Sequence, residues 1–216
     1  MTSVPRAGYH SPRRQQAAAA TRDAILDAAR ELFAAQGYGR TTMGQIADAA
    51  KVAANTVYTS VGGKPQLLLA IMEEGAGDPA GAETLAAIAR TADPAQVIRL
   101  TARGVRTVYE RHSQSITILL DSANDDSAAA EIHQAGLQHL REGLDESVRR
   151  LVALNALEPG EAGRAGDVFW YLFGFSSWRT LITDLGWNWD EAEVWLAQRG
   201  IDALLTWANA AQSGSG

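Results

Sequence analysis

The chain has 216 residues, of which 46% are hydrophobic and 20% charged, the composition of an ordinary globular protein large enough to bury a substantial core. It contains no cysteine, which excludes disulfides, thiolate metal ligands and cysteine nucleophiles. No stretch approaches about 18 uninterrupted apolar residues and the start lacks an apolar export signal, so we expect a cytoplasmic protein without a membrane span.

The formal net charge of −6 is distributed unevenly. Residues 1–72 contain eight basic and four acidic side chains, a balance of +4, whereas the remainder contains 11 basic and 21 acidic side chains, a balance of −10. A basic end on an acidic body is expected where one end contacts phosphates and the other avoids them. Chance asymmetry is the alternative.

Residues 1–15 are polar and predicted to form a mobile arm. Arg13 and Arg14 in it either enter a minor groove or only keep the arm soluble. The first helix is predicted from about Thr21 to Gln36, because apolar residues repeat there with a helical period, and Gly37 ends it.

Two short helices and one longer helix follow. Thr41 and Thr42 both offer an N-cap for the first, the break lies at residues 51–53, and the second runs from Ala54 to about Ser60. Lys64-Pro65 opens the longer helix, since proline is favoured in a first helical turn. Residues 16–64 therefore predict a helix-turn-helix DNA-binding domain.

The second short helix carries the predicted base contacts. Its outer face is small and polar, as entry into a major groove requires, with Ala53, Ala54, Asn55, Thr56 and Thr59. Asparagine can pair with an adenine edge, and threonine can bond a base or touch the thymine methyl. Tyr58 and Lys64 can reach phosphates. The alternative is the polar outer face of any small helical bundle.

The stretch from Thr21 to Met72 resembles the N-terminal domain of TetR/AcrR-family regulators in spacing, residue type and position. The matching residues are Thr21-Arg22, Ala28-Ala29, Leu32-Phe33, Gly37, Thr41-Thr42, Ile46-Ala47, Val52, Tyr58, Lys64 and Leu67. The resemblance implies phosphate-holding roles for Thr42, Tyr58 and Lys64. It also implies an all-α homodimer that binds double-stranded DNA at an inverted repeat and needs no cofactor. We expect a repressor that is released from this palindromic operator by a small, largely apolar effector.

Two residues depart from the family pattern. Lys51 stands where the family usually has glycine, and a left-handed backbone there would cost roughly 1 kcal/mol. Ala53 stands where the family favours a serine cap, whose loss typically costs about 1 kcal/mol. We expect a recognition helix that is loosely held until DNA orders it. Lys51 either contacts a phosphate or is simply solvated.

Residues 65–212 are predicted to form a larger helical domain for effector binding and dimerisation, followed by a flexible tail over 213–216. Its helices are expected at about 81–92, 95–112, 114–124, 126–155, 161–185 and 190–211. By resemblance, the last two form a four-helix dimer interface. Both are apolar over more than one stripe, with candidate interface residues Val168, Leu172, Val194, Ile201, Leu205 and Ala208. Alternatively, both helices are central in a monomer.

The resemblance places an effector cavity among the middle helices, and aromatic residues of the 161–185 segment are candidates to line it. The predicted effector residues are Tyr109, His133, Tyr171, Phe175 and Trp178, with His139 as a further polar candidate. Structural roles in the core are the alternative for all of them.

Little in the sequence suggests catalysis. His133 and His139 are six residues apart and do not share one helix face, and no metal-ligand motif is present. We therefore expect no enzyme and no metal. The remaining alternatives are a DNA-binding dimer that senses no small molecule, or an activator rather than a repressor.

Overall fold

The computed structural model describes residues 12–206, and every regular element within them is helical. The N-terminal elements are α1 (Pro12–Gln36), α2 (Met43–Ala49), α3 (Ala54–Ser60) and α4 (Lys64–Ala76). The middle elements are α5 (Pro79–Arg90), α6 (Pro94–Arg111), α7 (Ser113–Ser122) and α8 (Ser127–Ala153). The last elements are η1 (Pro159–Glu161), α9 (Ala162–Phe173), α10 (Phe175–Arg179), η2 (Thr180–Asp184), α11 (Trp189–Ile201) and η3 (Asp202–Thr206).

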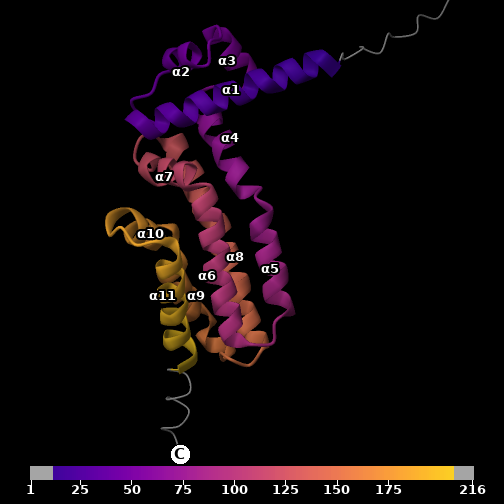
Figure 1. The fold of residues 1–216 in the computed structure, drawn as a ribbon, viewed down its shortest axis with the longest axis vertical. Coiled ribbons are helices and arrows are strands. Elements are labelled where there is room, and N and C mark those ends of the chain that lie inside the picture. Colours follow the sequence, from indigo (N-terminus) through magenta and orange to yellow (C-terminus); the bar gives the residue numbers. More distant parts are fainter. Residues whose placement is uncertain (1–11, 207–216) are drawn as a thin grey trace, which may run out of the picture.

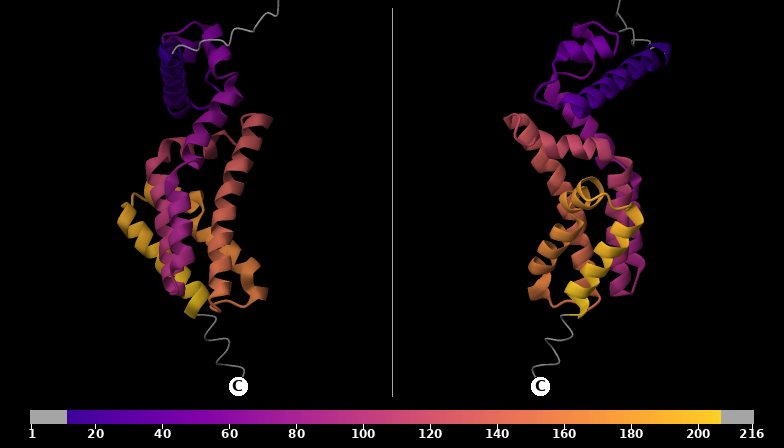
Figure 2. Two further views of the ribbon diagram at one scale, coloured as in Figure 1. Left: turned by 90° about the vertical axis from the view of Figure 1, so that its right-hand side faces the viewer. Right: turned by 60° about the vertical axis from the view of Figure 1, so that its left-hand side comes forward.

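The helices form two parts with separate cores. We call residues 12–64 the reader and residues 79–206 the body, and α4 joins them. The reader lies at one end of the elongated body (Figures 1 and 2). Its core, which α4 completes, contains Ile25, Leu26, Ala29, Phe33, Ile46, Val57, Leu67, Leu68 and Ile71. All of these side chains are buried, which confirms the helical stripes predicted for this part of the chain.

Side-chain caps fix where the helices begin. Thr42, not Thr41, caps α2: its hydroxyl accepts the Gln45 N–H, and the Gln45 side chain accepts the Thr42 N–H at 2.9 Å. Thr41 is buried and its hydroxyl donates to the Gly37 carbonyl. The caps of α5, α6, α8 and α11 are Asp78, Asp93, Asp126 and Asn188. These caps satisfy N–H groups that helix starts leave without partners.

The first helix begins earlier than predicted, at Pro12 instead of about Thr21. Residues 12–15 of the predicted arm are therefore its first turn, with Arg13 and Arg14 exposed on it. Four consecutive alanines, residues 17–20, explain the extension, because alanine has the highest helix propensity. Residues 1–11 of the arm and the 213–216 tail lie outside the described residues.

The single helix predicted over 161–185 is divided at Gly174. This glycine has an extended backbone (φ −62°, ψ 151°), which ends α9 and starts α10 in a new direction. A Cβ at this position would lie 2.5 Å from the Trp170 carbonyl oxygen, so the break needs glycine. The Ser177 hydroxyl donates to the Tyr171 carbonyl across the break. The predicted last helix also changes, from α11 to a π-helical turn at residue 202.

In the body, α6 and α8 lie side by side along the long axis, with α5 beside both (Figure 1). Close approach depends on small residues. A Cβ on Gly104 would lie 2.4 Å from the Thr84 side chain, which brings α6 against α5. Gly200 of α11 likewise lies against Ile98 and Phe173. The packing fixes α6 at the centre of the body.

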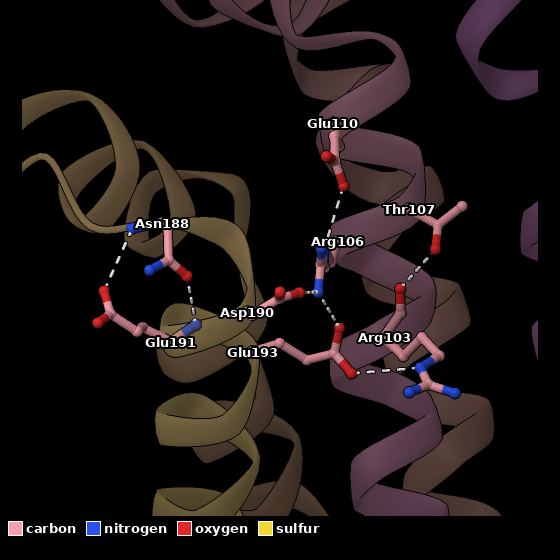
Figure 3. A network of polar contacts seen from close by, with 8 residues as sticks. All are labelled: Arg103, Arg106, Thr107, Glu110, Asn188, Asp190, Glu191 and Glu193. Carbon is pink, nitrogen blue, oxygen red and sulfur yellow. Dashed lines mark hydrogen bonds and ion pairs between the residues drawn. The ribbon is translucent and has the colours of Figure 1, made fainter.

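A charged network fastens α11 to α6 (Figure 3). Arg106 Nη1 lies 2.6 Å from Asp190 Oδ1 and 2.8 Å from Glu193 Oε2, while its Nε lies 3.2 Å from Glu110 Oε2. Arg103 contacts the other oxygen of Glu193 at 3.2 Å. The Arg106 and Glu193 side chains are only 21% and 15% exposed. The network therefore holds the N-terminal turn of α11 in one position.

Candidate nucleic-acid interface and effector cavity

The turn between α2 and α3 has the strained backbone that the sequence predicts. Lys51 has φ of +57°, in the left-handed region, and its side chain is exposed. The Val52 N–H donates to the Ala47 carbonyl at 3.0 Å and closes the turn. Ala53 occupies the N-cap of α3 and provides no side-chain cap. The structure thus contains both features, a turn residue with a left-handed backbone and an N-cap without a side-chain acceptor.

The outer face of α3 is open. Val57 is fully buried, and Arg22 of α1 donates to the Ser60 carbonyl at 3.2 Å, so the helix is held from inside and at its end. Tyr58 is 54% exposed. The predicted base-contacting residues Ala53, Ala54, Asn55 and Thr59 are exposed, and Thr56 is half-buried. These residues lie together on one accessible surface.

Thr59 has part of its hydrogen-bonding capacity already in use. Its hydroxyl donates to the carbonyls of Asn55 at 3.0 Å and Thr56 at 3.2 Å. The methyl group and the oxygen lone pairs remain available to a base. Thr42 is also exposed, at the start of α2.

The ammonium of Lys64 has partners within the reader. Its Nζ donates to the carbonyls of Tyr38 at 3.0 Å, and of Gly39 and Thr41 at 3.3 Å each. It also lies 4.2 Å from the centre of the Tyr38 ring. An ammonium has three protons, and three carbonyls accept them. A phosphate contact by this group would require it to leave those carbonyls, a constraint that sequence reasoning missed.

The loop of residues 38–41, whose carbonyls bind Lys64, also connects the reader to the body. The Gly39 N–H donates to Asp125 Oδ2 at 3.0 Å, next to the start of α8. Tyr38 is buried beside it, and this burial raises the pKa of its phenol, as does the negative charge of Asp126. The reader therefore contacts the body at this loop as well as through α4.

A cavity of about 720 Å³ lies among α4, α5, α6, α7 and α8. Its wall includes Met72, Gly75 and Ala76 from the C-terminal part of α4, and Gly77 directly after that helix. Most of the remaining wall is apolar, with Leu85, Ile88, Val105, Val108, Ile116, Leu119, Leu140, Leu144 and Phe175. A volume of several hundred Å³ with an apolar wall is typical of small-molecule sites.

A carboxylate–imidazole pair lies in the cavity wall where α4 meets α5. Asp78 Oδ2 is 2.8 Å from His112 Nε2, and Arg111 Nη1 is 3.0 Å from Asp78 Oδ1. The hydrogen bond from the Ala80 N–H lowers the pKa of Asp78, and His112 and Arg111 lower it further. The pair joins the start of α5 to the junction of α6 and α7. Sequence reasoning missed it, although Asp78-Pro79 is a helix-start signal.

Of the five predicted effector residues, the structure places only Phe175 in the cavity wall. Trp178 is fully buried in the body core, where its ring centre is 6.0 Å from that of Trp189. Tyr171 is 78% exposed on the outside of α9. Because the chain breaks at Gly174, Tyr171 and Trp178 lie on two different helices, α9 and α10. For Tyr171 and Trp178 the structure thus replaces the predicted cavity contact with a surface and a core position.

Tyr109 and His133 also lie away from this cavity. Tyr109 lines a separate cleft of about 850 Å³ between the end of α1 and the α6–α7 region, and its buried oxygen has no hydrogen-bond partner among the described residues. Burial raises the pKa of Tyr109. His133 Nδ1 is similarly buried without a partner, and burial lowers the pKa of this imidazole. His139 does line the cavity.

The predicted interface residues fall into two groups. Val194 is 69% exposed, whereas Leu172 is buried, and Val168, Ile201 and Leu205 are partly buried against the body core. Ala208 lies outside the described residues. Tyr171 of α9 and Trp195 of α11 are also exposed. They line a shallow apolar groove with Val168, Leu172 and Ala203, and Arg164, Asp167 and Arg199 are also in its wall.

Within residues 12–206, no helix has the length and apolarity needed to cross a membrane. In the same part of the chain, no three histidine, aspartate or glutamate side chains gather as metal ligands.

A short, accessible helix held from behind by a helix-turn-helix core defines a DNA-binding transcriptional regulator. Residues 25–71 match the protein family described as "Bacterial regulatory proteins, tetR family". The chain is 31% identical over 157 residues to the HTH-type transcriptional repressor NicS of Pseudomonas putida strain KT2440, covering 72% of this chain and 69% of that one. The chain belongs to the TetR family.

Solved structures share the fold over most of the chain. The fatty acid degradation regulator FadR from Bacillus halodurans has a TM-score of 0.70 at 16% identity, covering 85% of this chain and 96% of that one. The SmeT–triclosan complex has a TM-score of 0.65 at 21% identity, covering 85% and 91%. At these identities the likeness extends to the fold and no further.

Proposed function

We propose that this regulator is a cytoplasmic repressor that binds, as a homodimer, to an inverted-repeat operator and leaves it when a small, largely apolar effector enters the cavity. The observation that carries the proposal is the course of α4. This helix begins at Lys64, whose ammonium holds the reader loop, and ends at Ala76 in the cavity wall. A ligand that displaces the end of α4 would therefore move the reader.

The relatives support this proposal in two ways. NicS is named as a repressor, and SmeT was solved with triclosan. A coupling of about 1–3 kcal/mol, or 5–150-fold in affinity, is typical of allosteric proteins and would suffice for release.

The proposed dimer surface is the exposed side of α9 and α11. Tyr171 and Val194 are the two most exposed of the large apolar side chains described, and Trp195 is 42% exposed. A second copy would remove these side chains from water. Two-fold symmetry then places two readers on one side of the assembly, as an inverted repeat requires.

The DNA proposal is tested by selecting duplexes from a random pool with the purified protein. We expect an inverted repeat whose half-site centres are about 34–36 Å apart, or a multiple of that spacing. Asn55→Ala should relax the selected sequence, at about 1–3 kcal/mol on the cognate site if this residue reads a base. Selection of an asymmetric site, or no enrichment, would contradict the proposal.

The effector proposal is tested with Ser115→Leu, which fills the cavity from α7. We expect unchanged operator affinity but loss of the thermal stabilisation that small apolar compounds give to the unsubstituted protein. Ser176→Leu, at an exposed position on α10, makes the same replacement outside the cavity and should keep the response. Retention of the response in Ser115→Leu would show that effectors bind elsewhere.

A further inference from the structure

The acidic side chains of the described cavity wall have no lysine or arginine among them; the other polar side chains are hydroxyls and the imidazoles of His112 and His139, which can both donate and accept. Among the described residues that line the cavity there is no lysine, arginine, asparagine, glutamine, tyrosine or tryptophan. The carboxylates of Asp78, Glu142 and Glu146 line it instead. Carboxylates only accept hydrogen bonds when ionised. A ligand in this cavity therefore meets negative charges and, in the described wall, no lysine or arginine.

Two hydroxyls in the wall, those of Ser115 and Thr84, have no hydrogen-bond partner among the described residues, and Ser115 is the more deeply buried of the two. Ser115 is 7% exposed, and the structure gives its side chain no hydrogen bond within the described residues. Serine in a helix usually bonds a carbonyl one turn earlier, as Ser147 and Thr101 in the same wall do. The nearly buried Ser115 hydroxyl is left for a ligand.

In its neutral form the imidazole of His112 adds a second acceptor. Its Nε2 faces the carboxylate of Asp78 and must donate the proton between them. In the neutral ring this leaves Nδ1 without a proton, as an acceptor. A Cβ built on Gly75, which lines the cavity, would be 3.7 Å from this Nδ1. The acceptor therefore lies at the cavity wall.

Glu142 is the carboxylate in the wall that lacks a cationic partner. Asp78 pairs with Arg111, and Glu146 pairs with Arg149. Glu142 accepts only from the Gln138 amide, at 3.2 Å, among the described residues. Its negative charge is exposed at the edge of the apolar cavity, where it can attract a cation and repel an anion.

From this arrangement we infer that the effector is an apolar molecule carrying a protonated amine, whose head group lies by Glu142 and the free acceptors of the wall. The inference rests on the proposed function and specifies the ligand of the same cavity. An apolar carboxylate would lose water from its charged group on entering the cavity, and the described wall has no lysine or arginine to replace that water. Such a ligand is disfavoured.

The test uses three probes with one apolar body: decylamine, decan-1-ol and decanoate at pH 7. Calorimetry on the DNA-free protein should show decylamine binding about tenfold more tightly than decanoate, with decanol between them. Glu142→Gln should reduce that ratio by about threefold or more, and Glu142→Lys should favour decanoate. Glu131→Gln, an exposed position on the same helix outside the cavity wall, is the charge-matched control and should leave the ratio unchanged.

Decanoate binding as tightly as decylamine, or a ratio unaffected by both Glu142 substitutions, would overturn the inference while leaving the cavity as an effector site. No binding by any probe would overturn both the inference and the cavity's role, but not DNA binding, which the duplex selection measures separately. Release of the selected operator by decylamine then tests the coupling itself.

Discussion

Lys51 stores backbone strain in the turn before the recognition helix. A left-handed backbone crowds its Cβ, so Lys51→Gly should raise the free energy of unfolding by about 0.5–1 kcal/mol, part of the relief being offset by the greater freedom of glycine in the unfolded chain. Urea denaturation measures this. Lys51→Ala keeps the Cβ and should give no gain; an equal gain in both variants would assign the effect to the lysine side chain.

Lys64 is expected to stabilise the reader. Lys64→Met keeps a flexible apolar stem but leaves the carbonyls of the 38–41 loop without their donor, so the free energy of unfolding should fall by about 1–3 kcal/mol. Tyr58→Phe changes an exposed residue and should leave stability unchanged. Thermal unfolding of both variants makes the comparison. Equal stability of Lys64→Met and the unsubstituted protein would contradict a structural role.

At the residue scale, local features could be predicted and distant contacts could not. The Thr42 cap and the strained Lys51 depend on neighbours within a few positions, which the sequence displays. The Asp78–His112 pair joins residues 34 apart, and the free hydroxyl of Ser115 depends on how α7 faces the cavity. Such contacts are set by packing, which leaves no spacing pattern to read.

At the scale of elements, Asp78 makes the junction of α4, α5 and α6 sensitive to acid. Its pKa in the folded protein is below the ordinary value, so its contribution to stability is present above about pH 4 and is lost as the pH falls through the folded pKa. Asp78→Asn keeps a capping oxygen but cannot titrate. We expect the loss of stability below about pH 4 to be shallower in this variant.

Denaturation at a series of pH values checks this prediction, with Asp93→Asn as the control. Asp93 caps α6 in the same way but has no histidine partner in the described structure. Parallel acid limbs in the unsubstituted protein and Asp78→Asn would contradict the assignment.

Helices could be predicted with their approximate bounds wherever periodicity and caps agree, as in α2, α6 and α8. The break at Gly174 was missed because glycine can also occupy a helix interior, and the apolar pattern continues through it. Tyr171 and Trp178 were expected on one helix, whereas the break places them on α9 and α10. The density of aromatic residues in a segment does not reveal which of them faces the core, the surface or a cavity.

For the whole molecule, the exposed side of α9 and α11 should decide the oligomeric state. Val194→Glu places a charge on a side chain that is already 69% exposed in one chain, so folding should be retained while self-association is lost. Sedimentation at micromolar concentration should show a dimer for the unsubstituted protein and a monomer for the variant. Leu69→Glu, at an exposed position on α4, should remain dimeric.

A folded monomer for the unsubstituted protein would contradict the dimer. Leu205→Glu is a poorer test, because Leu205 is partly buried against the core. A glutamate there would also destabilise the fold, so a loss of dimer could not be separated from unfolding.

The reader has a positive charge balance and the body a negative one. The reader lies at one end of the long axis, and the body extends along the rest of it (Figure 1). This separation gives the molecule a large permanent electric dipole moment, although its net charge is negative. In the field of a nucleic acid the dipole experiences a torque, which turns the reader toward the phosphates before contact. Orientation therefore begins during diffusion, and the fraction of productive collisions should exceed that of a uniformly charged particle of the same net charge.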